Sequence, residues 1–404
     1  MSREAKRSMT LIVGYTSAGR LFLKEGDRAS REVTSPFAEG AVSRALRRSE
    51  KDAWKRRPAE GMFGGRLLWG TSEEPDAALV RPRITGLARA PDQGCLYFIL
   101  ETQSVGGLFH LRRDPQEEQR LFHKEGFHAK DPEFHPHSRL LAFSLPFPNG
   151  VSSIAVCDAE GRNIDRVTEG DSVDEAPSWL PDATKAFLYH SGGVARTSAG
   201  HPVGLAPCSI HRMDLATSKA ELVMEDRGWD FLQPHGMSDG DLLFIRRPYE
   251  PPGGKRVPFR TSIKDAAFFP FRVVKSVFDF LNAFAIAFSQ KPLTTAGGPK
   301  LRGPDLHTLL VRGRAVDARK ALEDFKPDGE PPPLVPSTWE LVRRGKRGGD
   351  RTLAKGVMAF DVGPDGTVLY TTGSAVYAMV GDEPPRRLEK GSLIDQVVFL
   401  EREP

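Results

Sequence analysis

The sequence is poor in cysteine: its 404 residues include three, Cys95, Cys157 and Cys208, and no two of them form a CxxC pair. A disulfide framework or a structural zinc site uses closely spaced ligands, so neither is expected, and no metal or other cofactor is predicted. Isolated cysteines are typical of buried thiols in a reducing compartment. The sequence therefore predicts a cytoplasmic protein.

The sequence also lacks a long uncharged apolar run. Leu11–Val13 is too short for the core of a signal peptide. The most apolar stretch, Ala266–Phe288, is interrupted by Arg272, Lys275 and Asp279, which argues against a membrane span. The GxSxG elbow, the P-loop, the dinucleotide-binding fingerprint and HExxH are absent too. No catalytic residue is therefore assigned from a motif, and the protein is predicted not to be an enzyme.

Charges of the two signs nearly cancel, with 57 Lys and Arg against 53 Asp and Glu, a formal net charge of +4. So small an excess gives no reason to expect a nucleic-acid partner. Glycine (39) and proline (32) are abundant, whereas aromatic residues, at 9%, are not. This composition favours many short strands and tight turns over a helical bundle.

A turn followed by an apolar strand recurs along the chain. Turns begin at Pro91, Pro136 and Pro181, 45 residues apart in each case, and again at Ser238 and Pro364. Pro-Asp-Gly suits a tight turn because proline presets φ, aspartate bonds back to the backbone and glycine accepts positive φ. The apolar strands after the turns are Leu96–Ile99, Leu140–Phe143, Ala186–Tyr189, Leu242–Ile245 and Val368–Tyr370.

Four of the five marked repeats continue directly with a third and a fourth short strand. Four strands in about 45 residues match one blade of a β-propeller, a four-stranded antiparallel sheet stacked on its neighbours around a channel. The predicted fold class is therefore all-β. The third strands are Leu108–Leu111, Ile154–Cys157, Ile210–Met213 and Val376–Met379, and the fourth are Arg120–Phe122, Arg166–Thr168, Glu221–Val223 and Arg387–Glu389.

Two segments that include marked turns resemble the D-x-P-x-W-S-P-D-G signature of TolB-type (WD40-like) β-propeller repeats. They are Asp131–Pro136 and Ala176–Asp182, and Asp158–Asn163 is similar to the turn that follows in that family. The turns depart from the pattern, since His137-Ser138 and Ala183-Thr184 replace Asp-Gly or Gly. The resemblance implies a divergent member of this repeat class. The same class builds the propellers of prolyl-oligopeptidase-like enzymes, which also need an α/β-hydrolase domain that this sequence does not contain.

The two ends of the chain are predicted to share a blade. Thr10–Tyr15 and Arg20–Lys24 have the pattern of a hairpin, and Leu393–Leu400 is a strand without a blade of its own. Joining them gives a six-bladed propeller that leaves no open sheet edge. A seventh blade, with Gly65–Gly70 as an inner strand, is the alternative. The propeller is thus assigned to 1–246 and 337–404.

Two segments interrupt the propeller. A basic helix is predicted at about 38–57, either solvated on the rim or a dock for an acidic partner or phosphates. The larger insertion, 247–336, begins and ends with proline-rich linkers and leaves the fourth marked repeat after its second strand. Its periodicity predicts an amphipathic helix over Ala266–Phe288 and a second helix over Asp305–Phe325.

The first inserted helix is rich in phenylalanine, so its apolar surface is expected to be buried against another surface. Burial against the second helix and the propeller, docking on a partner protein, self-association through a second copy, and contact with a membrane interface are the options. Its polar stripe, with two cations and one anion, fits a membrane surface poorly. We predict docking on a partner or a second copy. The docking residues are predicted to be Phe268, Phe271, Phe278, Phe284 and Phe288.

A second candidate surface is the mouth of the channel, where propellers commonly bind ligands. The loops leading into the innermost strands are expected to bring acidic, amide and imidazole groups together, which either bind a small molecule or ion or simply line a wet channel. A metal site at the nearby histidines is not favoured, since two of them fall on a turn. The candidate channel-mouth residues are His128, Asp131, Glu175, Asp230 and His235.

The sequence thus predicts a non-catalytic cytoplasmic scaffold or adaptor that mediates protein–protein interaction. A propeller hydrolase or lyase that acts at the channel mouth is the first alternative. A peripheral membrane component anchored by the phenylalanine-rich helix is the second. Fold class does not decide among them, because propellers host all of these roles.

Overall fold

The computed structural model describes residues 10–53, 82–251, 308–317 and 330–403, apart from 103–104, 114, 183, 312–313 and 382. Over these residues the protein is nearly all β, with a single α-helix. No helix in these ranges is both long and apolar enough to cross a membrane.

One sheet joins the two ends of the described chain. It consists of β1 (Thr10–Ser17), β2 (Arg20–Glu25), β3 (Arg31–Val33) and β27 (Ile394–Glu403). The order is β27-β1-β2-β3, so the last strand lies antiparallel beside the first. A Cβ added at Gly14 would lie 2.8 Å from Val398 Cγ1 on the partner strand, so only glycine allows this close approach. The pairing of the first hairpin with the last strand is the one that the sequence predicts.

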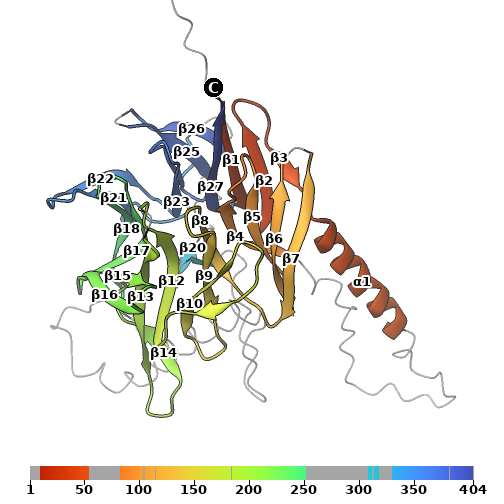
Figure 1. Cartoon of the computed structure of the whole chain (residues 1–404), viewed down its shortest axis with the longest axis horizontal. Coiled ribbons are helices and arrows are strands. Elements are labelled where there is room, and N and C mark those ends of the chain that lie inside the picture. Colours follow the sequence, from red (N-terminus) through yellow and green to blue (C-terminus); the bar gives the residue numbers. More distant parts are fainter. Residues whose placement is uncertain are drawn as a thin grey trace, which may run out of the picture.

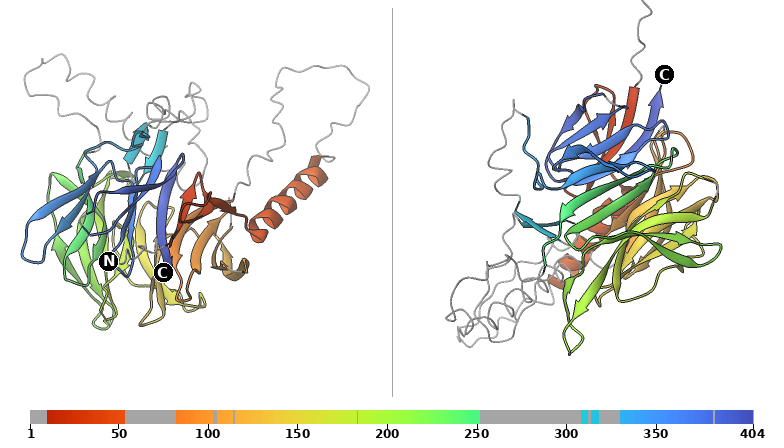
Figure 2. Two further views of the ribbon diagram at one scale, coloured as in Figure 1. Left: turned by 90° about the horizontal axis from the view of Figure 1, so that it is seen from above. Right: turned by 90° about the vertical axis from the view of Figure 1, so that its left-hand side faces the viewer.

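The helix α1 (Pro36–Ala53) follows this sheet. The Ser35 hydroxyl accepts a 3.2 Å hydrogen bond from the Ala38 N–H and so caps the first turn. The basic helix predicted at 38–57 is therefore present, and it begins earlier because Ser35 is the N-cap and proline suits the first helical position. Residues 54–57 lie outside the described part of the chain. Figure 2 shows α1 extending outward from the sheets.

Two marked repeats form separate four-stranded antiparallel sheets whose strands follow one another in chain order. The turns that begin at Pro91 and Pro364 connect the first two strands of each, as predicted. The first sheet contains β4 (Arg83–Arg89), β5 (Leu96–Glu101), β6 (Val105–Arg112) and β7 (Glu117–Glu125), and the second contains β23 (Ala359–Val362), β24 (Val368–Thr371), β25 (Ala375–Met379) and β26 (Arg386–Lys390).

Two further repeats are joined in one nine-stranded sheet by a parallel bridge between Ser152 and Val173. The first repeat contributes β8 (Lys130–His135), β9 (Leu140–Pro146), β10 (Ser152–Asp158) and the two-residue strand β11 (Asp165–Arg166). The second contributes β12 (Ser172–Trp179), β13 (Ala186–Arg196), β15 (Ser209–Asp214) and β16 (Lys219–Met224), and the short β14 (Pro202–Leu205) pairs with the long end of β13.

The large insertion interrupts a further four-stranded sheet. It is formed by β17 (Trp229–Gly236), β18 (Leu242–Pro248), β21 (Glu340–Arg344) and β22 (Asp350–Lys355). The chain leaves this sheet after its second strand and returns to pair β21 with β18, as the repeat spacing predicts.

The described part of the insertion corrects the prediction of a second helix over 305–325. Residues 308–317 form an antiparallel hairpin of β19 (Thr308–Val311) and β20 (Arg314–Asp317). Both strands contain β-branched residues, and a glycine stands between them in the sequence, a pattern that favours a hairpin over a helix. The phenylalanine-rich stretch 266–288, with all five predicted docking residues, lies outside the described residues.

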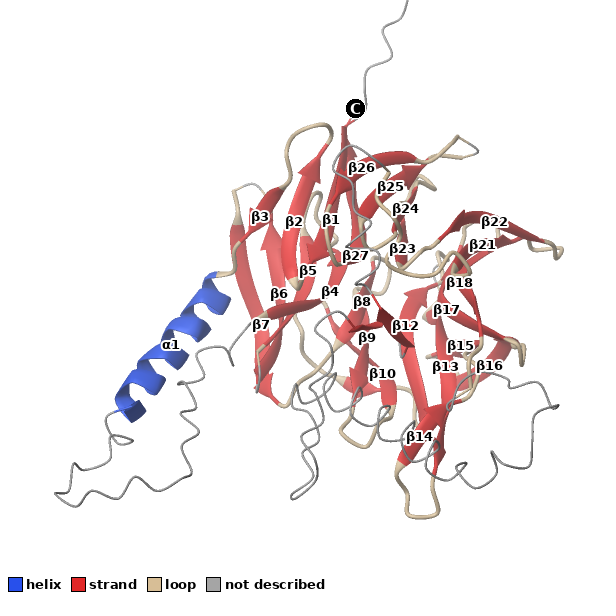
Figure 3. Ribbon diagram, turned by 180° about the vertical axis from the view of Figure 1, so that it is seen from behind, coloured by secondary structure: helices blue, strands red, loops and turns tan. Residues whose placement is uncertain are grey.

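The strands β4, β8, β12, β17, β23 and β27 lie at the centre of the molecule, and the other strands of each sheet lie farther out (Figures 1 and 3). We call these six the inner strands. Apolar side chains fill the space between neighbouring sheets. One cluster, for example, packs Ile12 and Leu21 of the first sheet with Leu96 and Phe109 of the next, and all four are almost fully buried.

Candidate functional site in the central channel

The inner strands surround a cavity of about 140 Å³, which we call the channel cavity. All six strands contribute to its lining, so side chains that are far apart in the sequence meet there. The polar residues among them are Arg89, Asp131, Glu133, Ser178, Gln233, His235, Asp361 and Gln396.

Three inner strands have the same bulge at this level. Asp131, Ala176 and Gln233 adopt positive φ values of 50°, 50° and 47°, and a proline follows each of them. The pairing register shifts at each of these positions. Positive φ is uncommon outside glycine, and a bulge re-aims the side chains beside it. The residues that follow the three prolines, and that line the cavity, are Glu133, Ser178 and His235.

These three residues form a chain of contacts across three neighbouring strands. The Ser178 hydroxyl donates a 3.3 Å hydrogen bond to Glu133 Oε1 and lies 3.0 Å from His235 Nδ1. Glu133 Oε1 also accepts a hydrogen bond from the backbone N–H of Trp179, at 3.2 Å. Across the cavity, Asp361 Oδ2 accepts a 2.6 Å hydrogen bond from the Phe399 N–H.

Glu133, His235 and Asp361 are half-buried in the wall of the channel cavity, and the surrounding protein shifts their pKa values. Burial, reinforced by the Asp361 carboxylate, raises the pKa of Glu133 to about 8 against the opposing hydrogen bonds from Ser178 and Trp179. Burial also raises the pKa of Asp361. Burial and the charge of Arg89 lower the pKa of His235 to about 4. At neutral pH, Glu133 is mainly protonated and His235 is uncharged.

Arg89 is the cation of this cluster. Its charge acts on Glu133, His235 and Asp361, yet its guanidinium makes no hydrogen bond or ion pair with any residue in the described ranges. Because Glu133 is mainly neutral, the positive charge of Arg89 is only partly compensated at neutral pH. An Arg in this state is a binding point for a carboxylate or phosphate group.

A second, larger hollow continues the channel cavity beyond the carboxyl ends of β4, β8 and β23. It has a volume of about 610 Å³, and we call it the mouth groove. Arg89 and Phe134 line both spaces, so the cation stands where the groove meets the channel. The other lining residues are mostly apolar or belong to the turns: Ala90, Pro91, Asp92, Gln93, Pro136, Pro364, Asp365, Phe399, Leu400 and Glu401.

The five channel residues predicted from the sequence divide into two groups. Asp131 and His235 line the channel cavity. The other three make contacts with nearby segments of the chain. His128 Nδ1 lies 3.6 Å from a Glu101 carboxylate oxygen, Glu175 pairs with Lys130 Nζ at 2.5 Å, and Asp230 pairs with Arg247 Nε at 2.8 Å.

The sequence analysis missed Arg89, Glu133, Ser178 and Asp361. A positional signal was present for most of them. Glu133, Ser178, His235 and Asp361 each stand three residues before the first residue of the next turn, at Pro136, Pro181, Ser238 and Pro364. Equivalent positions in successive repeats occupy equivalent places around a channel, so the repeat alignment itself points to this ring of side chains.

No family model matches the chain, and no curated protein matches it in sequence. In three dimensions it is similar to TolB from Acinetobacter baumannii, with a TM-score of 0.50 and 11% identity over 98% of this chain and 67% of that one. A nidogen/laminin complex matches with a TM-score of 0.48 and 7% identity, over 97% of this chain and 99% of that one. The tricorn protease matches with a TM-score of 0.44 and 11% identity, over 96% of this chain and 35% of that one. The fold is therefore that of a β-propeller, and the predicted likeness to TolB-type propellers is confirmed. At these identities the likeness concerns the fold alone.

Proposed function

We propose that this propeller is a non-catalytic interaction module that binds, in the mouth groove, a mainly apolar segment of a partner protein that places one carboxylate on Arg89. The observation that supports it best is Arg89, a cation without a hydrogen-bonding or ion-pairing partner in the described chain, at the inner end of a largely apolar groove. A partner carboxylate there would form charge-assisted hydrogen bonds with the guanidinium. Apolar residues beside that carboxylate would cover Phe134 and the prolines of the turns.

The proposal includes a propeller of six blades closed by both ends of the chain. Its support is the β1–β27 pairing and the six inner strands that line one cavity. Cytoplasmic location is also part of the proposal and rests on the three buried free thiols. The phenylalanine-rich helix is proposed as a second docking element, for a partner or a second copy of the chain.

Affinity capture from the native host with quantitative mass spectrometry tests the proposal. The bait proteins are the wild type, Arg89→Met and Arg386→Met. The Met side chain keeps the apolar stem and removes the charge, and Arg386 is an exposed arginine outside the groove. A partner captured by wild type and Arg386→Met and lost with Arg89→Met supports the proposal. Equal capture by all three baits contradicts it.

A propeller hydrolase or lyase remains the second candidate, and the contact chain of Glu133, Ser178 and His235 favours it. A protonated Glu133 is a potential general acid, whereas His235, with its pKa lowered to about 4, is a weak base that stays uncharged at neutral pH. The interaction proposal expects Asp131→Ala and His235→Ala to leave biological activity largely intact. Loss of activity in a stable variant that still captures its partner would move the enzyme to first place.

A further inference from the structure

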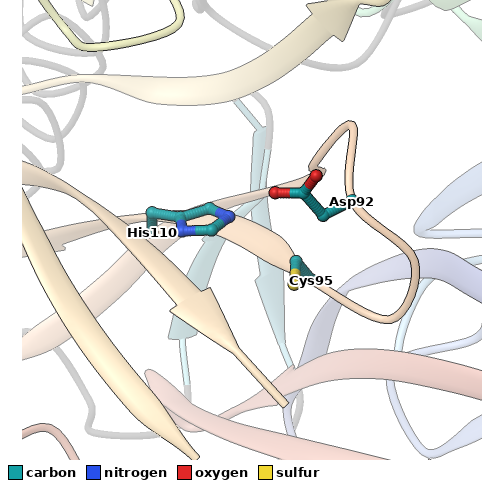
Figure 4. A group of neighbouring side chains, drawn as sticks. All are labelled: Asp92, Cys95 and His110. Carbon is teal, nitrogen blue, oxygen red and sulfur yellow. The ribbon is translucent and has the colours of Figure 1, made fainter. Parts of the chain in front are cut away.

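Three side chains of the types that bind metals converge beside the mouth groove (Figure 4). Asp92 belongs to the turn between β4 and β5, Cys95 immediately precedes β5, and His110 lies on β6. One ligand atom from each, a carboxylate oxygen, Sγ and a ring nitrogen, lies within 4.8 Å of the other two. Figure 4 shows the Asp92 carboxylate facing the His110 ring, with Cys95 beside them.

The His110 ring packs against the Tyr97 ring at 5.2 Å, a contact that leaves its nitrogens accessible to a ligand. Among the described residues, nothing forms a hydrogen bond or ion pair with the Asp92 carboxylate or the His110 ring nitrogens. Two neighbouring cations also pair with acids: Arg112 lies 3.5 Å from Glu117, and Arg113 lies 3.5 Å from Glu25 and 3.7 Å from Glu401. The charges of both still act on Cys95, and that of Arg112 acts on His110.

Burial raises the pKa of the Cys95 thiol, so in the absence of an ion the sulfur stays protonated and gives up its proton when a metal ion binds. Cys95 is only 4% exposed, and its sulfur accepts a hydrogen bond from the backbone N–H of Arg113. Hydrogen bonds of this kind orient and stabilise metal-bound thiolates. The buried sulfur is thus fixed in place, whereas Asp92 is exposed on a turn and free to move toward an ion.

We propose that Asp92, Cys95 and His110 form a three-ligand site for a zinc-class divalent ion. One thiolate, one imidazole and one carboxylate suit Zn²⁺, which prefers four ligands in a tetrahedron. Tetrahedral zinc ligands lie about 3.5 Å apart, so the three atoms need to close by about 1 Å. A rotation of the exposed Asp92 side chain supplies much of that movement.

The fourth position belongs to water or to an incoming group. Asp92 also lines the mouth groove, so an ion held by it lies at the edge of that groove. The site does not depend on the proposed partner binding, because its three ligands come from β6 and from the segment that connects β4 to β5. Sequence spacing did not reveal it, since His110 becomes a neighbour of Cys95 only when β6 pairs with β5.

Cobalt substitution is the test, because Co²⁺ reports both tetrahedral geometry and thiolate ligation in its absorption spectrum. Tag-free, reduced protein is titrated with Co²⁺ and then with Zn²⁺. We expect one equivalent of Co²⁺ to give visible tetrahedral bands and a near-ultraviolet sulfur-to-cobalt band, both abolished when Zn²⁺ displaces the cobalt. A protein that shows neither band at millimolar Co²⁺ overturns the proposal.

Single variants then assign the ligands. Cys95→Ser should lose the sulfur band, and Asp92→Asn and His110→Gln should each weaken Zn²⁺ binding by at least about tenfold. Cys157→Ser and the exposed His201→Ala are the matched controls and should bind as wild type does. Asp92→Asn is an exposed change, so it tests the site even if a buried variant misfolds. A sulfur band that survives Cys95→Ser, or Zn²⁺ affinity unchanged in Asp92→Asn, contradicts the assignment.

Discussion

Trp179 bonds to Glu133 twice across two neighbouring inner strands. Its backbone N–H donates to the Glu133 carboxylate at 3.2 Å, and its indole N–H donates to the Glu133 carbonyl at 3.1 Å. The Phe399 N–H makes the corresponding bond to Asp361 on the opposite side of the channel. An acid on one inner strand thus holds the next strand in place, which gives the channel acids a structural role as well as any role in binding.

Replacing Glu133 by glutamine should make the protein less sensitive to alkaline pH. In the folded protein the pKa of the Glu133 carboxyl is about 8, whereas a glutamate side chain in the unfolded chain has a pKa of 4.5. The folded state therefore keeps a proton that the unfolded chain loses. Wild-type stability therefore falls as pH rises from about 4.5 to about 8, and Glu133→Gln removes that loss, on the order of a few kcal/mol. Denaturant unfolding at pH 5 and pH 8.5 measures the difference.

The exposed Glu160 provides the matched control for this experiment. Glu160→Gln should follow the wild-type pH dependence. Parallel stability curves for wild type and Glu133→Gln over the whole range would show that the Glu133 carboxyl is not held protonated in the channel.

Gly106 on β6 should not tolerate a side chain. A Cβ there would lie 1.9 Å from the carbonyl oxygen of Phe127, a backbone atom that cannot move aside cheaply. Gly106→Ala should destabilise the fold by about 2–3 kcal/mol. Gly193 on β13 is the control, because its added Cβ would meet nothing closer than 3.8 Å. Thermal melts of both variants test this, and equal melting temperatures would count against the close strand approach.

Loss of the last strand should open the sheet that contains both ends. A chain that stops at Ser392 leaves one edge of β1 unpaired, although β1 still pairs with β2, and exposes apolar residues of β1 to solvent. We expect a large fall in soluble yield. Val398→Asp, at a position 3% exposed, should act in the same direction, whereas Val223→Asp, at a position 47% exposed, should not. A truncated protein with an unchanged melting temperature would rule out closure by both ends.

The phenylalanine-rich helix remains a prediction from the sequence. Full burial of one phenylalanine is worth roughly 1.5–3 kcal/mol, so a helix with several of them is covered in the working assembly. Replacing Phe278, Phe284 and Phe288 by serine should abolish association and leave the propeller folded. Size-exclusion chromatography and thermal melts separate the two roles, because a purely internal packing helix would give unchanged assembly with a lower melting temperature.

The repeat could be predicted from the sequence because its signals are local. Proline and glycine at the turns and short apolar runs after them depend on neighbouring residues alone, so β5, β9, β13, β18 and β24 lie where the pattern placed them. The hairpin at 308–317 was mistaken for helix because short apolar runs fit both periods. The β-branched residues and the glycine between the two runs were the local signal for a hairpin.

The channel site was harder to predict because its chemistry depends on burial. Asp131 and His235 were found from their residue types and their place near the innermost strands. By residue type alone, Glu133 and Asp361 resemble ordinary surface acids, and Arg89 resembles an ordinary surface cation; only the repeat position of the two acids sets them apart. Only the convergence of six strands in space enclosed them and left the arginine without a pairing partner among the described residues.

The most direct measurement of the central claim is the dissociation constant of the captured partner for wild type, Arg89→Lys, Arg89→Met and Arg386→Met. Removing a partly buried charge that is hydrogen-bonded to a ligand carboxylate costs about 2–5 kcal/mol, so Arg89→Met should bind at least about 30-fold more weakly. Arg89→Lys keeps the charge but loses the planar guanidinium that can bind a carboxylate with two hydrogen bonds. Its dissociation constant should therefore lie between those of wild type and Arg89→Met. Arg386→Met should match wild type. Equal dissociation constants for all four proteins, each with an unchanged melting temperature, would contradict the account.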